Sequence, residues 1–358
     1  MSLPPLQQFG FARENTNIQS FGSGLINHTW LIESSNKKYI LQRINQKVFT
    51  NPSAIDENIQ AIARYLQQNY PGYCFTVPLR SIHNESLVKT GGDFFRLFNF
   101  IESSHSYDTV QHPQLAYEAA KQFGKFTNLL SGFDALLLKI TIPDFHNLTL
   151  RYRQFEEAIS HAAEERIYKA GDLVETLKAN RNIVSEYEHI QHNPFFKIRV
   201  THHDTKISNV LFDINNKGIC VIDLDTVMPG YFISDVGDMM RTYLSAAGEE
   251  ETDLSAINIR EDYFDAIVHG YLSEMQDELT SEETNAFVYA GKFMIYMQAL
   301  RFLADFLNND IYYGAKYELH NYNRAANQIA LLNALMEKED VLHSRVDSFL
   351  NKTRVIAW

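Results

Sequence analysis

Residues 200–225 read Val-Thr-His-His-Asp-Thr-Lys-Ile-Ser-Asn-Val-Leu-Phe-Asp-Ile-Asn-Asn-Lys-Gly-Ile-Cys-Val-Ile-Asp-Leu-Asp. An apolar strand end leads into a polar loop, and two further apolar runs flank a turn at Asn215-Asn216-Lys217-Gly218. Alternating apolar residues around such a turn predict a β-hairpin. Its second strand stops on two acids, so the hairpin carries the polar groups of the loop and these acids to one edge.

The polar groups of this segment have the types and the spacing that phosphoryl transfer needs. Asp204 can accept a hydroxyl proton, Lys206 can neutralise phosphate charge, and Asn209 follows the Asp by five residues. Asp223 and Asp225 beyond the hairpin add oxygen ligands for Mg²⁺. The spacing matches the kinase catalytic loop H-R-D-x-x-x-x-N with its later metal-binding Asp. The alternative is a buried hairpin with an Asp cap.

The overall composition limits the class of protein. A chain of 358 residues exceeds one typical core, so two lobes are expected. The net charge of −12 argues against a protein that binds nucleic acid, because such binding depends on Lys and Arg that neutralise phosphates. We find no signal peptide and no apolar run of membrane-spanning length, and we expect a cytoplasmic protein that does not bind membranes.

A glycine-containing turn lies upstream of the catalytic loop. Residues 16–45 show period-2 patterning with breaks at residues 21–24 and 34–36, which predicts three antiparallel strands. The first break and the strand after it are expected to approach the nucleotide phosphates through Gly22, Ser23, Gly24, Asn27 and Thr29. A simple hairpin turn is the alternative.

The nucleotide-binding lobe also needs a cation and an adenine pocket. The strand at residues 39–45 has no Lys, so Arg43 is our first choice for the phosphate cation, with Gln42 as the alternative. Glu57 lies on the next predicted helix, where an ion-pair partner or a solvated surface acid is expected. Phe98 and Phe100 end an apolar strand and are candidates to contact adenine, although an edge strand would look the same.

Beyond residue 101 the patterning is mostly helical, and this predicts an α+β fold with two lobes. We expect a small antiparallel-sheet lobe with one helix at residues 1–100 and a larger, mostly helical catalytic lobe at residues 101–358. The expected helices are at about 113–131, 149–163, 171–192, 236–247, 260–275, 281–308 and 320–350. Thr280 and Glu283 form a capping-box pattern, and Asp235 is expected to cap the helix that follows it.

One late helix offers candidates for binding the phosphate acceptor. Arg301 and Asp305 are four residues apart and share a helix face, so they form either a salt bridge or part of a polar patch near the cleft. Tyr312 and Tyr313 follow the end of this helix.

Four segments resemble the N-acetylhexosamine 1-kinases within the aminoglycoside phosphotransferase and choline kinase superfamily. They are Phe21-Gly-Ser-Gly-Leu-Ile-Asn-His-Thr-Trp, Tyr39-Ile-Leu-Gln-Arg-Ile-Asn, His203-Asp-Thr-Lys-Ile-Ser-Asn-Val-Leu-Phe-Asp and Met297-Gln-Ala-Leu-Arg-Phe-Leu-Ala-Asp-Phe-Leu. The resemblance implies a two-lobe, protein kinase-like fold that transfers the ATP γ-phosphate to the anomeric hydroxyl of N-acetylglucosamine or N-acetylgalactosamine.

The resemblance also assigns roles to particular residues. It makes Asp204 the base, Asn209 and Asp223 the Mg²⁺ ligands, Asp225 a ligand of metal or sugar, and Arg301 with Tyr312 or Tyr313 contacts to the sugar. The competing hypotheses are a kinase for an aminoglycoside, choline or homoserine-like substrate, and a nucleotide-binding pseudokinase or scaffold. The sequence does not determine the oligomeric state.

Overall fold

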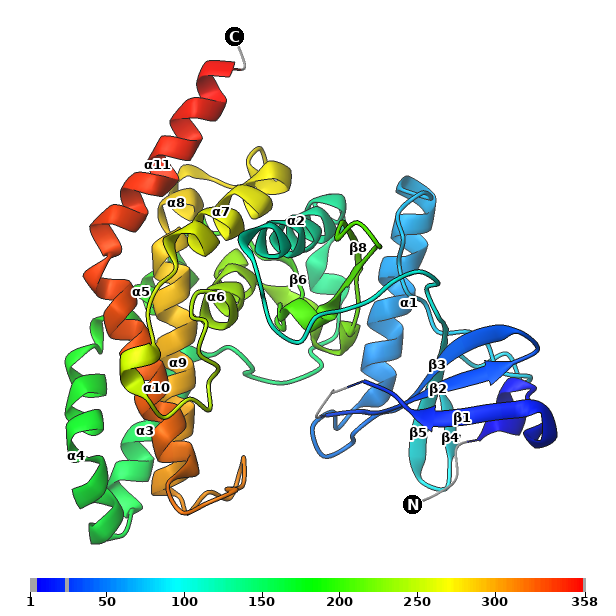
Figure 1. Cartoon of the computed structure of the whole chain (residues 1–358), viewed down its shortest axis with the longest axis horizontal. Coiled ribbons are helices and arrows are strands. Elements are labelled where there is room, and N and C mark those ends of the chain that lie inside the picture. The colour runs from blue at the N-terminus through cyan, green and yellow to red at the C-terminus, as the bar shows by residue number, and fades with distance from the viewer. Residues whose placement is uncertain (1–4, 23–25, 357–358) are drawn as a thin grey trace.

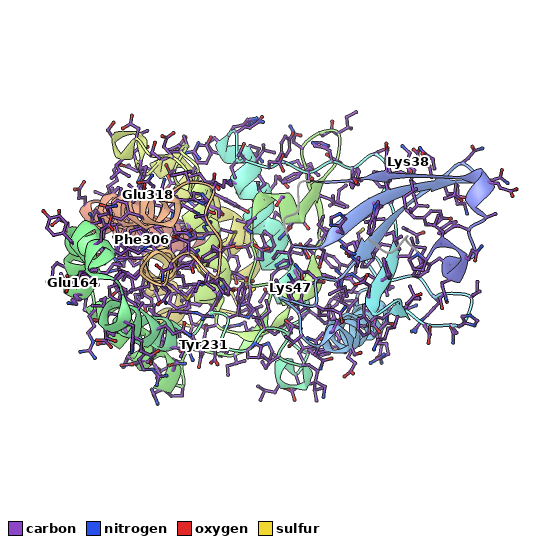
Figure 2. The ribbon with its side chains drawn as sticks, turned by 90° about the horizontal axis from the view of Figure 1, so that it is seen from below. Lys38, Lys47, Glu164, Tyr231, Phe306 and Glu318 are labelled. Carbon is purple, nitrogen blue, oxygen red and sulfur yellow. The ribbon has the colours of Figure 1, made fainter. Side chains whose placement is uncertain are left out.

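The computed structural model describes residues 5–22 and 26–356 and confirms the predicted α+β fold. An antiparallel sheet near the N-terminus stands apart from a larger helical part, with helix α1 (Pro52–Asn69) between them (Figure 1). Lys38 lies on the sheet, far from Glu164, Phe306 and Glu318 in the helical part, and Lys47 lies between these two regions (Figure 2). None of the helices in the described ranges is both long and apolar enough to span a bilayer.

The N-terminal sheet contains the three predicted strands and two more. Its order is β1-β2-β3-β5-β4, with neighbours antiparallel. The strands are β1 (Thr16–Ser20), β2 (His28–Ser34), β3 (Lys37–Arg43), β4 (Val88–Thr90) and β5 (Asp93–Asn99).

The two faces of this sheet differ in character because successive side chains of a strand point to opposite sides. Trp30, Leu41 and Leu97 are cross-strand neighbours and belong to a small apolar core with Leu6. The opposite face carries the polar neighbours Thr29, Gln42 and Arg96. The register therefore gathers polar groups from three strands on one face.

The C-terminal part is built on a long apolar helix. Helix α9 (Phe287–Leu307) is buried along most of its length and packs against α3, α6 and α10. A Cβ on Gly237 of α6 would lie 2.3 Å from the Ala290 carbonyl oxygen of α9, so only glycine permits this close helix contact. The helices are α2 (Pro113–Leu129), α3 (Leu148–His161), α4 (Glu164–Ala179), α5 (Asn182–His192), α6 (Phe232–Tyr243), α7 (Glu261–Met275), α8 (Ser281–Asn285), α9, α10 (His320–Glu337) and α11 (Glu339–Ile356).

Several expected helix boundaries were wrong. The single helices predicted at 171–192, 281–308 and 320–350 are each split in two, with breaks at Asn180-Arg181, Ala286 and Lys338. The helix predicted from residue 236 begins at Phe232. At these breaks the N–H groups of Asn180, Ala286 and Lys338 bond to carbonyls three residues back, which ends the α-helical ladder without glycine or proline.

The central loop region forms short strands between α5 and α6. The predicted hairpin is β7 (Val210–Phe212) with β8 (Gly218–Val221), and β6 (Arg199–Thr201) pairs with β9 (Met228–Gly230). A short 3-10 turn, η5 (Leu224–Thr226), begins directly after Asp223 and contains Asp225. These strands place residues 202–209 and 222–226 next to one another, since the Ile222 N–H donates to the Asn209 carbonyl at 2.8 Å.

Candidate active site

Two buried acids of α6 hold the loop after β6 through hydrogen bonds to its backbone. Asp235 accepts the backbone N–H groups of His202 and His203 at 3.0 and 2.7 Å, and Asp238 accepts that of Thr205 at 2.9 Å. The expectation that Asp235 caps its own helix is therefore wrong, because α6 begins earlier and the carboxylate turns toward the loop. These bonds fix the loop backbone on both sides of Asp204.

The two histidines before Asp204 act as uncharged packing groups. Burial lowers the pKa of His202, and burial lowers the pKa of His203 to about 4. His202 Nε2 lies 3.0 Å from the Ile222 carbonyl oxygen, which fixes Nε2–H as the donor and leaves Nδ1 to accept the Asp204 N–H at 3.3 Å. A Cβ on Gly230 would lie 2.5 Å from the His203 ring, so glycine is needed on the facing strand.

The predicted catalytic groups come together around Asp204. Lys206 Nζ lies 3.1 Å from one carboxylate oxygen, and Asn209 Nδ2 donates to the other at 3.1 Å and to the Asp204 carbonyl at 2.8 Å. The neighbouring Asp204 charge raises the pKa of Lys206. Asp204 remains partly open to solvent, with 20% of its side chain exposed, so an acceptor hydroxyl can reach it.

The two acids after the hairpin have different surroundings. Asp223 adopts a left-handed backbone conformation with φ 59° and is open to solvent, whereas Asp225 is 1% exposed. Asp225 Oδ2 accepts Asn27 Nδ2 at 2.7 Å, and its Oδ1 lies 2.5 Å from Arg96 NH1. Asp225 therefore links the segment after the hairpin to the N-terminal sheet.

The surroundings of Asp223 fit a divalent cation. Although solvent reaches this side chain, protein encloses much of it, and this desolvation together with the charges of Asp225 and Asp204 raises the pKa of Asp223 to about 7. A bound cation would relieve this repulsion. Within the described ranges no three His, Cys, Asp or Glu side chains group into a metal site. Mg²⁺ commonly uses only one or two protein carboxylates and completes its shell with phosphates and waters, which suits Asp223 and Asn209.

Only some of the residues predicted to bind the nucleotide lie near Asp223 and Asp225. Asn27 reaches Asp225, and Thr29 Oγ1 accepts Gln42 Nε2 at 3.4 Å. Gly22 precedes Asn27 in the chain and adopts a left-handed backbone conformation with φ 80°. Ser23 and Gly24 lie outside the described residues.

Arg43 and Glu57 do not lie near the catalytic loop or the acids that follow it. Arg43 follows Gln42 by one residue and therefore points to the opposite face of the sheet, where its NH1 lies 3.5 Å from Asp93. Glu57 is exposed on α1. Its buried neighbour Asn58 faces the C-terminal part instead, where its Nδ2 donates to the Val227 carbonyl at 3.0 Å.

Phe98 shares a face of β5 with Arg96, a residue that the sequence did not indicate, and Phe100 follows the end of the strand. The Arg96 guanidinium lies 5.2 Å from the Phe98 ring centroid. Phe100 meets Phe21 edge to face with centroids 6.2 Å apart. Aromatic side chains of this kind are what a base-binding pocket requires.

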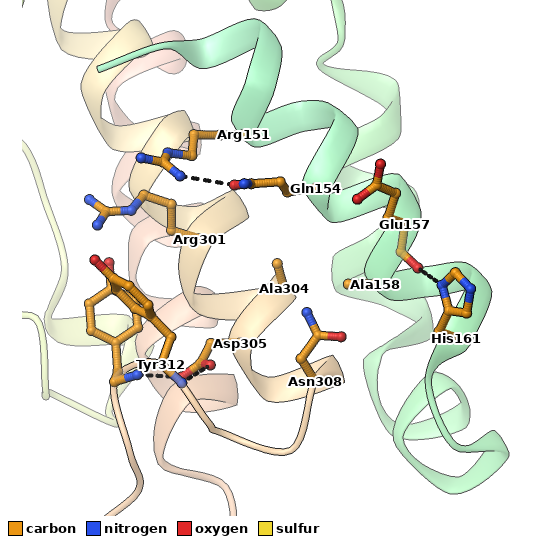
Figure 3. Close-up of a pocket in the computed structure, with 11 residues that line it drawn as sticks. Arg151, Gln154, Glu157, Ala158, His161, Arg301, Ala304, Asp305, Asn308 and Tyr312 are labelled. Carbon is orange, nitrogen blue, oxygen red and sulfur yellow. Dashed lines mark hydrogen bonds between the residues drawn. The ribbon is translucent and has the colours of Figure 1, made fainter. Parts of the chain in front are cut away.

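A cavity of about 460 Å³ lies between α3 and α9 and contains the predicted acceptor residues. Arg151 and Arg301 lie side by side near Tyr312, with His161 and Asn308 at the other end (Figure 3). The cavity is lined by Arg151, Gln154, Glu157, Ala158, His161, Arg301, Ala304, Asp305, Asn308, Tyr312 and Tyr313.

The expected alternative of an Arg301–Asp305 salt bridge is wrong. Asp305 accepts the backbone N–H groups of Tyr312 and Tyr313 at 2.8 and 2.9 Å and thereby holds the loop after α9. Arg301 NH1 donates instead to Gln298 Oε1 at 3.1 Å, and its guanidinium lies 5.5 Å from the Tyr313 ring and 5.9 Å from the Tyr312 ring. Its charge is left facing the cavity.

Arg151 is a cavity residue that sequence reasoning missed. It donates to Gln154 Oε1 and to the Asp144 carbonyl, each at 2.9 Å. Burial and the nearby Arg301 charge lower the pKa of Arg151, which shows that the two guanidinium groups repel one another. A single Arg on an amphipathic helix carries no local signal of such a role.

Aromatic contacts connect this cavity to the catalytic loop. The Arg301 guanidinium lies 6.0 Å from the Phe145 ring, and Phe145 stacks on His146 with centroids 4.3 Å apart. His146 in turn contacts His203, with their Nδ1 atoms 3.3 Å apart. Phe145 and His146 therefore link this cavity to His203, the residue that precedes Asp204.

Comparisons with known proteins agree with this geometry. Residues 17–276 match the model of the phosphotransferase enzyme family. An aminoglycoside phosphotransferase from Alicyclobacillus acidocaldarius superposes with a TM-score of 0.61 at 11% identity, covering 98% of both chains. A microcompartment-associated aminopropanol kinase gives 0.60 at 16% identity, covering 95% of this chain and 97% of the other.

A third solved structure is spectinomycin phosphotransferase in complex with ADP and spectinomycin. It superposes with a TM-score of 0.55 at 12% identity and covers 92% of this chain and 95% of the other. Identities this low show a shared fold, whereas the family match covers the sheet, the catalytic loop and the acids that follow it. The chain therefore belongs to the phosphotransferase enzyme family.

Proposed function

We propose that this protein transfers the γ-phosphate of Mg²⁺-bound ATP to the anomeric hydroxyl of an N-acetylhexosamine. The observation that supports the acceptor assignment is the pair Arg151 and Arg301 in a cavity that Phe145 and His146 link to the catalytic loop. Two neighbouring guanidinium groups without a carboxylate between them favour an acceptor rich in oxygen atoms.

The catalytic loop supplies the proton acceptor. Asp204 takes the proton of the acceptor hydroxyl while the hydroxyl oxygen bonds to the γ-phosphorus and the bond from that phosphorus to the ADP oxygen breaks. Asn209 and the loop backbone orient the Asp204 carboxylate, and Lys206 offsets negative charge beside it. Asn209 and Asp223 would hold Mg²⁺, whose charge stabilises the phosphate oxygens during transfer.

The cavity is better suited to a neutral amido sugar than to an amine. The similar solved structures include a kinase for aminopropanol and a phosphotransferase in complex with spectinomycin. An ammonium group would be repelled by Arg151 and Arg301, and the two oxygens of Asp305 are already engaged by backbone N–H groups. Hydroxyl and amide carbonyl oxygens accept hydrogen bonds from Arg and Tyr, and about 460 Å³ suits a small ligand.

A second candidate acceptor is an alcohol that bears a carboxylate, such as a homoserine-like compound. The same arginine pair favours it, because a guanidinium binds carboxylate through two parallel hydrogen bonds. A nucleotide-binding pseudokinase is less well supported, since Asp204, Asn209 and Asp223 are all present and near one another.

A substrate screen with Mg²⁺-ATP tests the proposal by measuring ADP release. The panel contains N-acetylglucosamine, N-acetylgalactosamine, glucose, homoserine, choline and an aminoglycoside. We expect turnover with an N-acetylhexosamine and loss of its reducing end, because phosphate on the anomeric oxygen blocks ring opening. Turnover with choline or the aminoglycoside alone contradicts the acceptor assignment, and no turnover with any compound supports the pseudokinase.

Arg301→Ala links the screen to the cavity. Loss of a charge-assisted hydrogen bond should lower kcat/KM for the sugar by about 10- to 100-fold and leave the KM for ATP nearly unchanged. Arg151→Ala should act in the same direction. Arg153→Ala is the matched control, because Arg153 is exposed on the same helix and does not line the cavity. Unaltered sugar kinetics in Arg301→Ala would remove this residue from acceptor binding.

A further inference from the structure

Arg96 is a buried cation on the polar face of the N-terminal sheet. Its side chain is 3% exposed, and it lies directly across from Gln42 in the register of β3 and β5. Its Nε and NH2 groups donate to Gln42 Oε1 at 3.0 and 2.8 Å. Gln42 thus orients the guanidinium through its carbonyl oxygen.

The remaining nitrogen of Arg96 faces the segment that follows the catalytic hairpin. NH1 lies 2.5 Å from Asp225 Oδ1, yet neither atom has a well-aligned hydrogen bond with a protein partner. The two groups form a buried ion pair in which NH1 faces the Asp225 carboxylate. Asp223 precedes Asp225 by two residues, so Arg96 contacts the segment that carries the predicted metal ligand.

Kinase-like folds normally place a Lys on β3 against the nucleotide phosphates. In this chain β3 carries Gln42 and Arg43; Gln42 has no charge, and Arg43 points to the other face toward Asp93. We propose that Arg96 on β5 is the cation that binds the nucleotide phosphates and that Gln42 is its positioning residue. This inference rests on the proposed kinase function and extends it to a residue that the sequence did not indicate.

The chemistry of the guanidinium supports the assignment. Arg presents five N–H donors in a fixed plane, and two of its three nitrogens are committed to Gln42. NH1 is the nitrogen that Gln42 does not use, and phosphate oxygens, which match the fork of an Arg, would share it with Asp225. Phe98 lies 5.2 Å from the same guanidinium and shares a face of β5 with Arg96, so the phosphate cation lies next to one adenine candidate, and Phe100 follows just after the strand ends at Asn99.

Calorimetric titration with ADP and with adenosine, without acceptor and with and without Mg²⁺, tests this proposal. In Arg96→Met the dissociation constant for ADP should rise about 10- to 100-fold in both conditions, while that for adenosine changes less than about twofold. Lys89→Met on β4 is the control for loss of an exposed positive charge from the same sheet and should leave both constants unchanged.

A relocated charge completes the test. The double variant Gln42→Lys/Arg96→Met puts the cation back on β3 and should recover most of the ADP affinity. Arg96→Lys, which keeps the charge but lacks the fork, should show a smaller loss and carries the test if Arg96→Met does not fold. The proposal is overturned if ADP affinity is normal in the Arg96 variants, or if Arg43→Gln alone abolishes the preference for ADP.

Failure of the wider kinase function would look different. Wild-type protein that binds ADP no more tightly than adenosine would contradict nucleotide phosphate binding as a whole. Wild-type protein that prefers ADP, with the same preference in Arg96→Met, would contradict only the role of Arg96.

Discussion

At the residue scale, Asp204 is held by groups that orient its carboxylate without neutralising it completely. Asn209 donates to one oxygen, Lys206 approaches the other, and the backbone on both sides is bonded to acids of α6. A carboxylate positioned in this way can receive a hydroxyl proton with little reorganisation.

Replacement of Asp204 by Asn tests its role as base. The amide keeps the shape but cannot take the proton, so kcat should fall by about 10²- to 10⁴-fold. Nucleotide affinity should survive, because ADP phosphates are proposed to bind Arg96. Steady-state kinetics and ADP titration measure the two effects, and near-normal turnover would exclude Asp204 as the base.

His203 makes stability depend on pH. Its pKa is about 4 in the folded protein, against an ordinary value of 6.5, so the unfolded chain binds more protons between these values. The stability that this neutral ring contributes is complete above pH 6.5 and is lost as the pH falls toward 4. Asp235 changes stability in the opposite direction. Burial raises its pKa to about 7, so the folded protein holds a proton that the unfolded chain has released, and this stability is lost as the pH rises.

His203→Asn isolates this contribution, since Asn tolerates the left-handed conformation that His203 adopts with φ 66°. The difference in unfolding free energy between wild type and variant should shrink by on the order of 2 kcal/mol from pH 7 to pH 5. Urea unfolding at several pH values measures it. A difference that stays constant over this range would show that the pKa of His203 is the same in the folded and unfolded protein.

At the element scale, the strand that leads into the catalytic loop is anchored to the N-terminus of a helix. Arg199 of β6 forms two parallel hydrogen bonds with Glu283, which is fully buried. Glu283 also completes the predicted capping box with Thr280 at the start of α8. One carboxylate therefore connects β6, α8 and the chain between them.

Glu283→Gln should destabilise the protein by roughly 3–5 kcal/mol, because it leaves the buried Arg199 charge without its partner. Urea unfolding and the melting temperature measure the loss. Glu282→Gln on the same turn is the matched control and should change stability by less than about 0.5 kcal/mol. Equal effects of the two substitutions would mean that the buried Arg199–Glu283 ion pair does not stabilise the protein more than a surface acid does.

At the scale of the whole molecule, α1 is attached to the C-terminal part more firmly than to the sheet. Its buried face, with Ile55, Ile59 and Ile62, belongs to the large apolar core rather than to the small core of the sheet. Asn58 adds polar contacts: Nδ2 donates to the Lys139 carbonyl at 2.8 Å, and Oδ1 accepts the Lys139 N–H at 2.7 Å.

Asn58→Ala removes these contacts together with the bond to the Val227 carbonyl. We expect a loss of about 1–3 kcal/mol of unfolding free energy, because buried backbone groups lose their partners. Asn69→Ala is the control, since Asn69 is exposed on the same helix and its Nδ2 donates to Tyr65 within that helix. Similar melting temperatures for both variants would contradict a tethering role for Asn58.

The sequence by itself determined the elements whose signals are local. Asp204, Asn209 and Asp223 fall within twenty residues joined by a hairpin, so their order and spacing predicted that they would meet. The three N-terminal strands and the capping box at Thr280 follow from periodicity and from short motifs in the same way.

Only the tertiary structure decided which cations face the site. Arg43 and Gln42 are adjacent, and because a strand alternates its faces, one residue of difference separates the polar face from the core face. Arg96 enters through cross-strand register, and Arg151 meets Arg301 only because α3 packs against α9. Such neighbours are far apart in sequence, so no local pattern brings them together; the packing of the elements does.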